Sequence, residues 1–283
     1  MDSGRTTKWW VPWALLAPGF LWLVVFFALP LVSLLRESLD NSERTRRLGG
    51  GGLKNYTQVF DQYQDVILRT FAYAAIATLL CIAIGYPLAY LIAMKGGRYK
   101  NALLAAVVLP FFTTYLIRTI AWRVIVDKEG PLVGVFRAIH LMGKNDELLA
   151  TPTAVIFALV YNFLPFMVLP IYVSLEKIDR RLLEAGPDLY ASGARTFRKV
   201  TLPLSLPGVF AGSLLTFIPA AGDFVNADLL GSDRTRMIGN IIERNFLQEQ
   251  FRPGISALSF VLMALILGAV LVYARLLGTE DLI

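Results

Sequence analysis

Long apolar runs separated by short charged segments dominate the hydrophobic pattern of this chain. A helix that crosses about 30 Å of hydrocarbon needs roughly 20 residues with few or no charges. The runs are continuous Leu, Val, Ile, Ala and Phe, without the two-residue alternation of a membrane β-barrel. The pattern therefore predicts an all-α integral membrane protein with six transmembrane helices. We place these spans at about residues 9–35, 70–94, 101–123, 148–175, 203–224 and 253–275.

The third span contains the shortest uncharged run, which ends at Arg118 and is followed by Arg123. Arginine in or beside a membrane helix extends its head group to the interface or lines a water-filled cavity. We expect both arginines to do one or the other.

Composition agrees with the membrane interpretation. The chain is 56% hydrophobic and only 17% charged, with a mean hydropathy of +0.58, against roughly 25% charged residues in soluble domains. One Cys and one His exclude a disulfide framework and the usual zinc clusters, so we expect no metal site. The net charge of +6 is spread over short segments between the apolar runs, which indicates membrane orientation and no nucleic-acid partner.

The charged segment between the fourth and fifth spans predicts a short amphipathic helix. Asp179 can cap it, and apolar residues recur at spacings of three and four. The apolar stripe consists of Ile178, Leu182, Ala185 and Leu189, and the polar face of Arg180, Arg181, Glu184 and Asp188. Such a helix lies either in the groove of a partner protein or on the membrane surface, and both alternatives stay open on the pattern alone.

Five residue pairs in and after this segment have a specific spacing: Glu184-Ala185, Asp188-Leu189, Ala191-Ser192, Thr196-Phe197 and Leu202-Pro203. The spacing resembles the EAA loop of type I ABC importer permeases, the cytoplasmic element that docks into the ATPase subunit. Residues 160–172 and 175–179 are similar to the first permease subunit of spermidine/putrescine transporters. The likeness covers most of the chain, including residues 54–57, 228–231 and 238–240.

The resemblance implies a single transmembrane permease domain over residues 1–283, with residues 176–203 as a cytoplasmic coupling loop. It places the chain in the bacterial cell (inner or plasma) membrane as a multi-pass protein with both termini in the cytoplasm. Docking to the ATPase is expected through residues 179–203. Within them, the resemblance assigns the coupling role to Leu182, Glu184, Ala185, Leu189, Ala191, Ser192 and Gly193.

Three residues depart from the EAA pattern. Gly186 stands where the family usually has a third alanine, Pro187 follows it, and Tyr190 replaces the family's characteristic glycine. Proline removes a helical hydrogen bond and clashes with the preceding turn at a cost of about 3 kcal/mol. We therefore expect a kink or break near Leu183 to Pro187. For the bulky Tyr190, either the ATPase groove is wider here or the tyrosine points elsewhere, with Gly193 taking over the turn.

Chemistry for nucleotide hydrolysis is absent from the sequence. A phosphate-binding loop needs Gly-x-x-x-x-Gly-Lys-Ser/Thr. The pair Gly143-Lys144 has Ala138 where the first glycine should stand and Asn145 after the lysine. We expect no catalytic residues and no cofactor in this chain, with ATP and Mg bound by the partner ATPase that the resemblance implies.

A passage for an organic cation needs carboxylates, carbonyls and aromatic faces in place of water. The end of the fifth span offers Asp223, Phe224, Asn226 and Asp228. The alternative is that the two acids merely begin an outer loop. Weaker candidates are Tyr161, Asn162 and Tyr86, because membrane helices also use Tyr and Asn for packing.

We therefore interpret the chain as the permease subunit of an ATP-driven importer, with spermidine or putrescine as the favoured solute. The resemblance implies a second homologous permease subunit, two copies of an ATPase subunit and an extracytoplasmic solute-binding protein, all assembled in the lipid bilayer. One alternative is an ABC permease for another solute, such as iron or thiamine. Another is a stand-alone secondary transporter, which would need inverted internal repeats that the sequence does not display.

Overall fold

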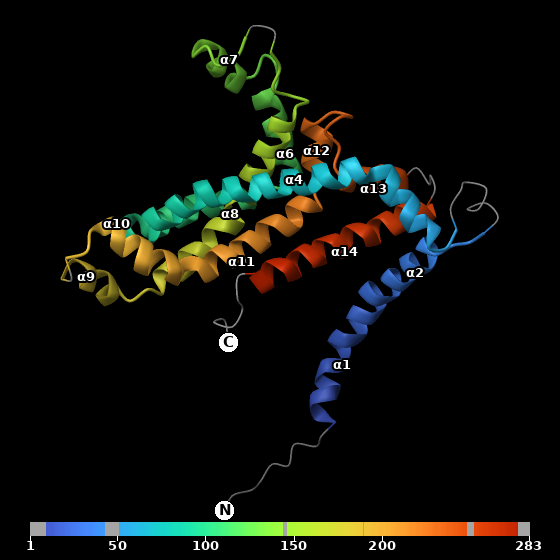
Figure 1. The fold of residues 1–283 in the computed structure, drawn as a ribbon, viewed down its shortest axis with the longest axis horizontal. Helices are drawn as coiled ribbons and strands as arrows, with labels where there is room; N and C mark the ends of the chain where they lie inside the picture. Colours follow the sequence, from blue (N-terminus) through green and yellow to red (C-terminus); the bar gives the residue numbers. More distant parts are fainter. Residues whose placement is uncertain (1–9, 43–50, 144–145, 189, 248–251, 277–283) are drawn as a thin grey trace, which may run out of the picture. The chain divides into compact units, whose positions relative to one another are not determined.

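The computed structural model describes residues 10–42, 51–143, 146–188, 190–247 and 252–276. Within these residues, every regular element is a helix (Figure 1). Contacts group the chain into two units, one of residues 1–62 and 244–261 and the other of residues 63–243 and 262–283.

The first unit contains α1 (Val11–Leu23), the π-helical turn η1 (Val24–Ala28) and α2 (Leu29–Ser38), which follow one another without a break. The next helix, α4 (Lys54–Tyr90), begins in this unit, well before the span predicted from residue 70. Asn55 joins the two helical stretches, because its buried amide donates to the carbonyl of Ser38 at 2.9 Å and accepts from the Gly51 N–H at 2.7 Å. This contact gives residues 54–57 a structural role at the start of α4.

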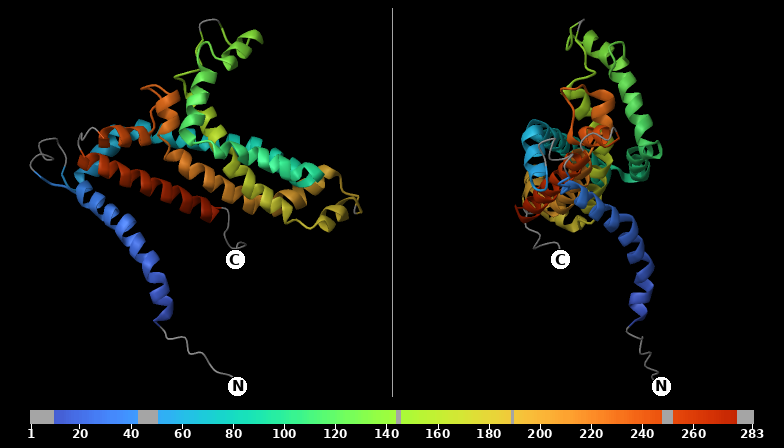
Figure 2. Two further views of the ribbon diagram at one scale, coloured as in Figure 1. Left: turned by 180° about the vertical axis from the view of Figure 1, so that it is seen from behind. Right: turned by 90° about the vertical axis from the view of Figure 1, so that its right-hand side faces the viewer.

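The remaining helices follow in chain order (Figure 2). They are η2 (Leu91–Lys95), η3 (Gly97–Tyr99), α5 (Lys100–Val108), η4 (Leu109–Phe112), α6 (Tyr115–Val126), α7 (Pro131–Ala138), α8 (Pro152–Glu176), α9 (Arg180–Asp188), α10 (Gly193–Thr196), η5 (Phe197–Thr201), α11 (Leu202–Ala221), α12 (Val225–Leu230), α13 (Ile238–Leu247) and α14 (Arg252–Leu276).

Five helices in the described residues are long and apolar enough to cross a membrane, and a bent pair would make a sixth span. The pair joins residues 97–112 to residues 115–138 and bends by 94°. The third span predicted at about residues 101–123 therefore falls on this bent pair and is not one continuous helix. Pro110 cannot donate a helical hydrogen bond, and Thr113 and Thr114 are extended, so the helix stops and restarts in a new direction (Figure 1).

Helices α4, α8 and α11 run side by side in the second unit (Figures 1 and 2). Between α8 and α11 the backbones approach closely at two glycines spaced four residues apart. A Cβ atom on Gly208 would lie 2.6 Å from the carbonyl oxygen of Pro170, and one on Gly212 would lie 3.0 Å from that of Met167. Small residues at this spacing let membrane helices pack tightly, so α8 and α11 form a closely joined pair.

Candidate functional site

Helix α9 forms most of the predicted amphipathic helix in the coupling loop. Asp179 caps its first turn as the sequence predicts, with the carboxylate accepting from the Arg181 N–H at 3.0 Å. The helix then continues without interruption from Arg180 to Asp188. The break expected near Leu183 to Pro187 therefore does not interrupt the helix, which ends at Asp188, one residue after Pro187.

The side chains of α9 divide into an inner and an outer face. Leu183 packs against the hydrophobic core of the second unit. Leu182 is half exposed, and Glu184 and Ala185 are exposed on the other side. Leu189, which the sequence assigned to the same stripe, lies outside the described residues. The helix thus presents a mixed apolar and charged face that is exposed among the residues the structure describes.

The turn after α9 is left-handed at Tyr190, which has φ of +56° and a side chain 96% exposed. The Ala191 N–H donates to the carbonyl of Gly186 at 3.0 Å, the bond that closes a Schellman-type helix end. The prediction that Gly193 takes over this turn is wrong, because Gly193 begins α10 and Ser192 caps it by accepting from the Arg195 N–H at 3.4 Å. The left-handed conformation explains why a glycine suits position 190.

Close packing against α10 explains the glycine at position 186. A Cβ atom at this position would collide with the hydroxyl and methyl groups of Thr196 on α10. The small residue therefore lets the end of α9 lie directly against α10, and an alanine here requires Thr196 to move.

Tyr190→Gly should stabilise the α9–α10 turn. A left-handed conformation costs an L-residue about 1–2 kcal/mol, which glycine does not pay. Glycine loses more conformational entropy on folding, so only part of this energy is gained as stability. We expect about fivefold slower hydrogen exchange of the Ala191 amide, measured by exchange mass spectrometry or NMR. The matched control is Ala194→Gly, which places glycine inside α10 and should speed exchange. Unchanged or faster exchange in Tyr190→Gly would contradict this account.

Helix α11 connects the coupling loop to a second candidate site. It begins directly after η5 and ends at Ala221, two residues before Asp223. Its 20 residues extend about 30 Å. Helix α11 therefore spans the distance from the coupling loop to the residues just before Asp223.

A buried set of polar side chains lies where α6, α8 and α12 meet. We call it the polar cluster, and it consists of Tyr115, Thr119, Asn162, Asp223 and Asn226. The Tyr115 hydroxyl donates to the Asp223 carboxylate, and the Asn226 backbone N–H donates to the same carboxylate at 2.9 Å. The Asn226 amide nitrogen donates to the Tyr115 hydroxyl at 2.5 Å.

The other side of the polar cluster centres on the Asn226 side-chain oxygen. It accepts from Asn162 at 3.0 Å and from Thr119 at 3.2 Å. Asn162 and Asn226 are almost completely buried and Asp223 is 7% exposed, but the Asn162 oxygen has no hydrogen-bond partner within the described chain. A buried carboxylate and an acceptor without a donor in the same cluster favour a cationic or hydrogen-bond-donating group there.

The structure brings together only part of the predicted cation path. Asp223, Asn226 and Asn162 meet in the polar cluster. Phe224 and Asp228 are exposed. Tyr161 lies on the same helix as Asn162 but has its ring against Trp122, with the centroids 5.2 Å apart. Tyr86 lies near the start of α11, where its hydroxyl bonds to Ser205 at 2.8 Å.

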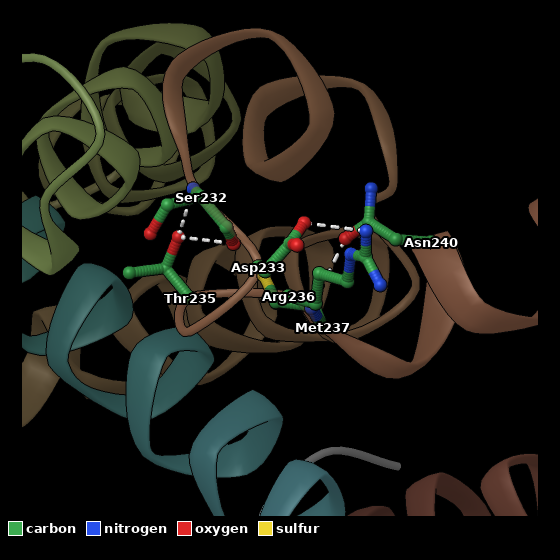
Figure 3. A network of polar contacts seen from close by, with 6 residues as sticks. All are labelled: Ser232, Asp233, Thr235, Arg236, Met237 and Asn240. Atoms are coloured by element: carbon green, nitrogen blue, oxygen red, sulfur yellow. Dashed lines mark hydrogen bonds and ion pairs between the residues drawn. The ribbon is translucent and has the colours of Figure 1, made fainter.

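Residues 232–240 contain a second network of polar contacts, which reaches the backbone next to Asp223 (Figure 3). The Ser232 N–H donates to the Thr235 hydroxyl at 2.6 Å, and the Met237 N–H donates to the Asn240 side chain at 3.0 Å. Asn240 also donates to the carbonyl of Phe224 at 2.5 Å, next to Asp223. Helix α4 secures the segment from the other side, where Arg69 donates to the carbonyl of Arg236 at 2.9 Å.

Sequence reasoning missed Tyr115, Thr119 and Asn240. Tyr115 and Thr119 stand four residues apart in an apolar run, which places them on one face of a helix. That spacing was the available signal, but it does not say what the face contacts. Among the described residues, no group of three or more His, Cys, Asp or Glu side chains could hold a metal ion.

Residues 85–277 match the model of a family described as "Binding-protein-dependent transport system inner membrane component". The chain belongs to this family. It is 38% identical over 258 residues to the "Spermidine/putrescine transport system permease protein PotB" of Haemophilus influenzae, covering 90% of each chain. The fold class predicted from the sequence, a helical ABC importer permease, is confirmed, and the chain is a multi-pass membrane permease subunit.

Two solved structures have the same fold. One is a bacterial ABC transporter involved in the import of the acidic polysaccharide alginate, with a TM-score of 0.74, 18% identity and 94% coverage of each chain. The other is a bacterial alginate ABC transporter in complex with an alginate pentasaccharide-bound periplasmic protein, with a TM-score of 0.71, 18% identity and coverage of 94% and 93%. At 18% identity these structures establish the permease fold and do not identify the solute.

Proposed function

We propose that this permease carries spermidine or putrescine as part of an ATP-driven importer. The observation that supports this most strongly is the 38% identity to a spermidine/putrescine permease over nine-tenths of both chains. The polar cluster is consistent with a cationic solute, because a buried carboxylate is the group that an alkylammonium needs when it leaves water. An acidic polysaccharide would meet repulsion at the same place.

The partner ATPase binds ATP and Mg and docks on the outer face of α9. Leu182 and Ala185 enter its groove, and Glu184 lies at the rim. Ala191, Ser192 and Gly193 form the turn that fixes α9 against α10. With the coupling loop in the cytoplasm, both chain termini are cytoplasmic as well. A second permease subunit, two ATPase copies and an extracytoplasmic binding protein complete the importer.

Alternating access follows from the continuity of α11. Closure of the two ATPases moves α9 and α10, and α11 transmits this movement to Asp223 and Asn226 at its far end. The polar cluster joins three helices, so a shift of α11 changes the spacing of its donors and acceptors. An ammonium group is bound in one arrangement and released in the other.

The complex should show ATP hydrolysis that rises when spermidine and the binding protein are added together. Co-purification identifies the partner chains, and the reconstituted complex in proteoliposomes gives the ATPase rate for each solute. Iron and thiamine serve as competing solutes in the same assay. Stimulation by one of these and not by spermidine or putrescine would overturn the polyamine assignment while leaving the permease assignment intact.

A further inference from the structure

Arg118 on α6 is a buried arginine with an unusual environment. Its side chain is 8% exposed, and neither Nε nor Nη1 has a hydrogen-bond partner within the described chain. We expected Arg118 to extend to the membrane surface or to line a water-filled cavity, and its side chain is buried in the protein instead of extended to a surface. Arg123, one turn further along, is exposed. A buried charge without an acceptor is costly, so the rings around Arg118 supply the attraction.

The guanidinium lies over aromatic rings. Its carbon is 4.9 Å from the ring centre of Phe111 and 5.7 Å from that of Tyr115. Phe166 packs edge-on against Phe111 at 5.0 Å, and Phe163 lies 6.3 Å from both Tyr115 and Phe166. These four residues form what we call the aromatic group. Aromatic faces around a cation are the means by which proteins hold alkylammonium ligands.

Tyr115 belongs to both the aromatic group and the polar cluster. Its ring face is turned to Arg118, and its hydroxyl donates to the Asp223 carboxylate. A cation seated on the aromatic group is therefore one side chain away from the buried acid. The two sites are adjacent, and the Arg118 guanidinium lies at the first of them.

We propose that Arg118 occupies a cation site which an ammonium group of the solute takes during transport. The proposal rests on the function proposed above. It assigns the aromatic group as the binding site for a primary ammonium group next to Asp223. Arginine has a long flexible side chain, so it leaves the rings when a solute ammonium replaces it. While it is seated, it keeps other cations out of the permease.

Removing the arginine should free the site for the solute. In the complete transporter complex without binding protein, Arg118→Ala should bind radiolabelled spermidine about tenfold more tightly by equilibrium dialysis, because the internal competitor is lost. Free guanidinium at millimolar concentration should compete with spermidine in Arg118→Ala and leave the unmodified complex unaffected. Adding Phe111→Leu to Arg118→Ala should cancel the gain, since it removes one aromatic face.

Arg123→Ala is the matched control, because it removes an exposed arginine from the same helix. Arg118→Gln keeps a polar side chain and shows the same gain if Arg118→Ala fails to assemble. Spermidine binding by Arg118→Ala and Arg118→Gln that equals the control, without guanidinium competition, would overturn the proposal, as would loss of assembly in both variants. An unmodified complex that neither binds nor transports spermidine refutes the polyamine function instead.

Discussion

Ala185→Asp should abolish binding of the ATPase to this permease while the chain remains in the membrane. Ala185 is exposed on the outer face of α9, beside the half-exposed Leu182, so an aspartate fits there without entering the core of its own chain. In a partner's groove, however, an aspartate becomes a buried charge without a counter-ion. Such a charge costs about 3–5 kcal/mol, which corresponds to more than about a hundredfold in affinity.

A pull-down of the ATPase with the permease, followed by solute-stimulated ATP hydrolysis, measures this effect. Ala194→Asp introduces the same charge at an exposed alanine of α10 and should leave most of the binding intact. Membrane insertion of both variants is compared by fractionation. Recovery of a normal amount of active ATPase with Ala185→Asp would remove α9 from the interface and favour a helix that lies on the membrane surface.

The coupling loop illustrates what local sequence can predict. Helix α9 follows from the spacing of its apolar residues, and its Asp179 cap follows from a carboxylate that stands two residues before the N–H that donates to it. The position of Gly186 against Thr196 does not follow, because it depends on how α9 folds back over α10. The left-handed backbone conformation of Tyr190 could not be predicted either, since a bulky residue rarely adopts it.

The polar cluster illustrates what local sequence misses. Asp223 and Asn226 were identifiable because a carboxylate and an amide beside an apolar run are costly unless they have partners. Their partners Tyr115 and Thr119 lie more than a hundred positions earlier in the chain. The 94° bend after Phe112 is what carries α6 to α12 and α8, and no periodicity within residues 101–123 indicates its direction.

Asp223→Asn should lower spermidine transport by at least about tenfold while expression and assembly stay normal. The carboxylate accepts from the Tyr115 hydroxyl, from the Asn226 backbone at 2.9 Å and from the Asn226 amide at 3.4 Å. An amide in its place turns one acceptor into a donor that faces other donors. It also removes the charge that attracts an ammonium, and disturbing a buried hydrogen bond of this kind costs about 1–3 kcal/mol.

Transport of labelled spermidine into proteoliposomes, measured over a range of concentrations, checks this prediction. Asp228→Asn is the matched control, because Asp228 is an exposed acid on α12, five residues after the buried Asp223, and we expect a smaller loss there. A melting curve of each complex separates a path defect from unfolding, since only the latter lowers the transition temperature. Suppose that both variants transport at the unmodified rate. In that case the two acids only mark the start of an outer loop, and the cation path must be sought at Tyr161, Asn162 and Tyr86.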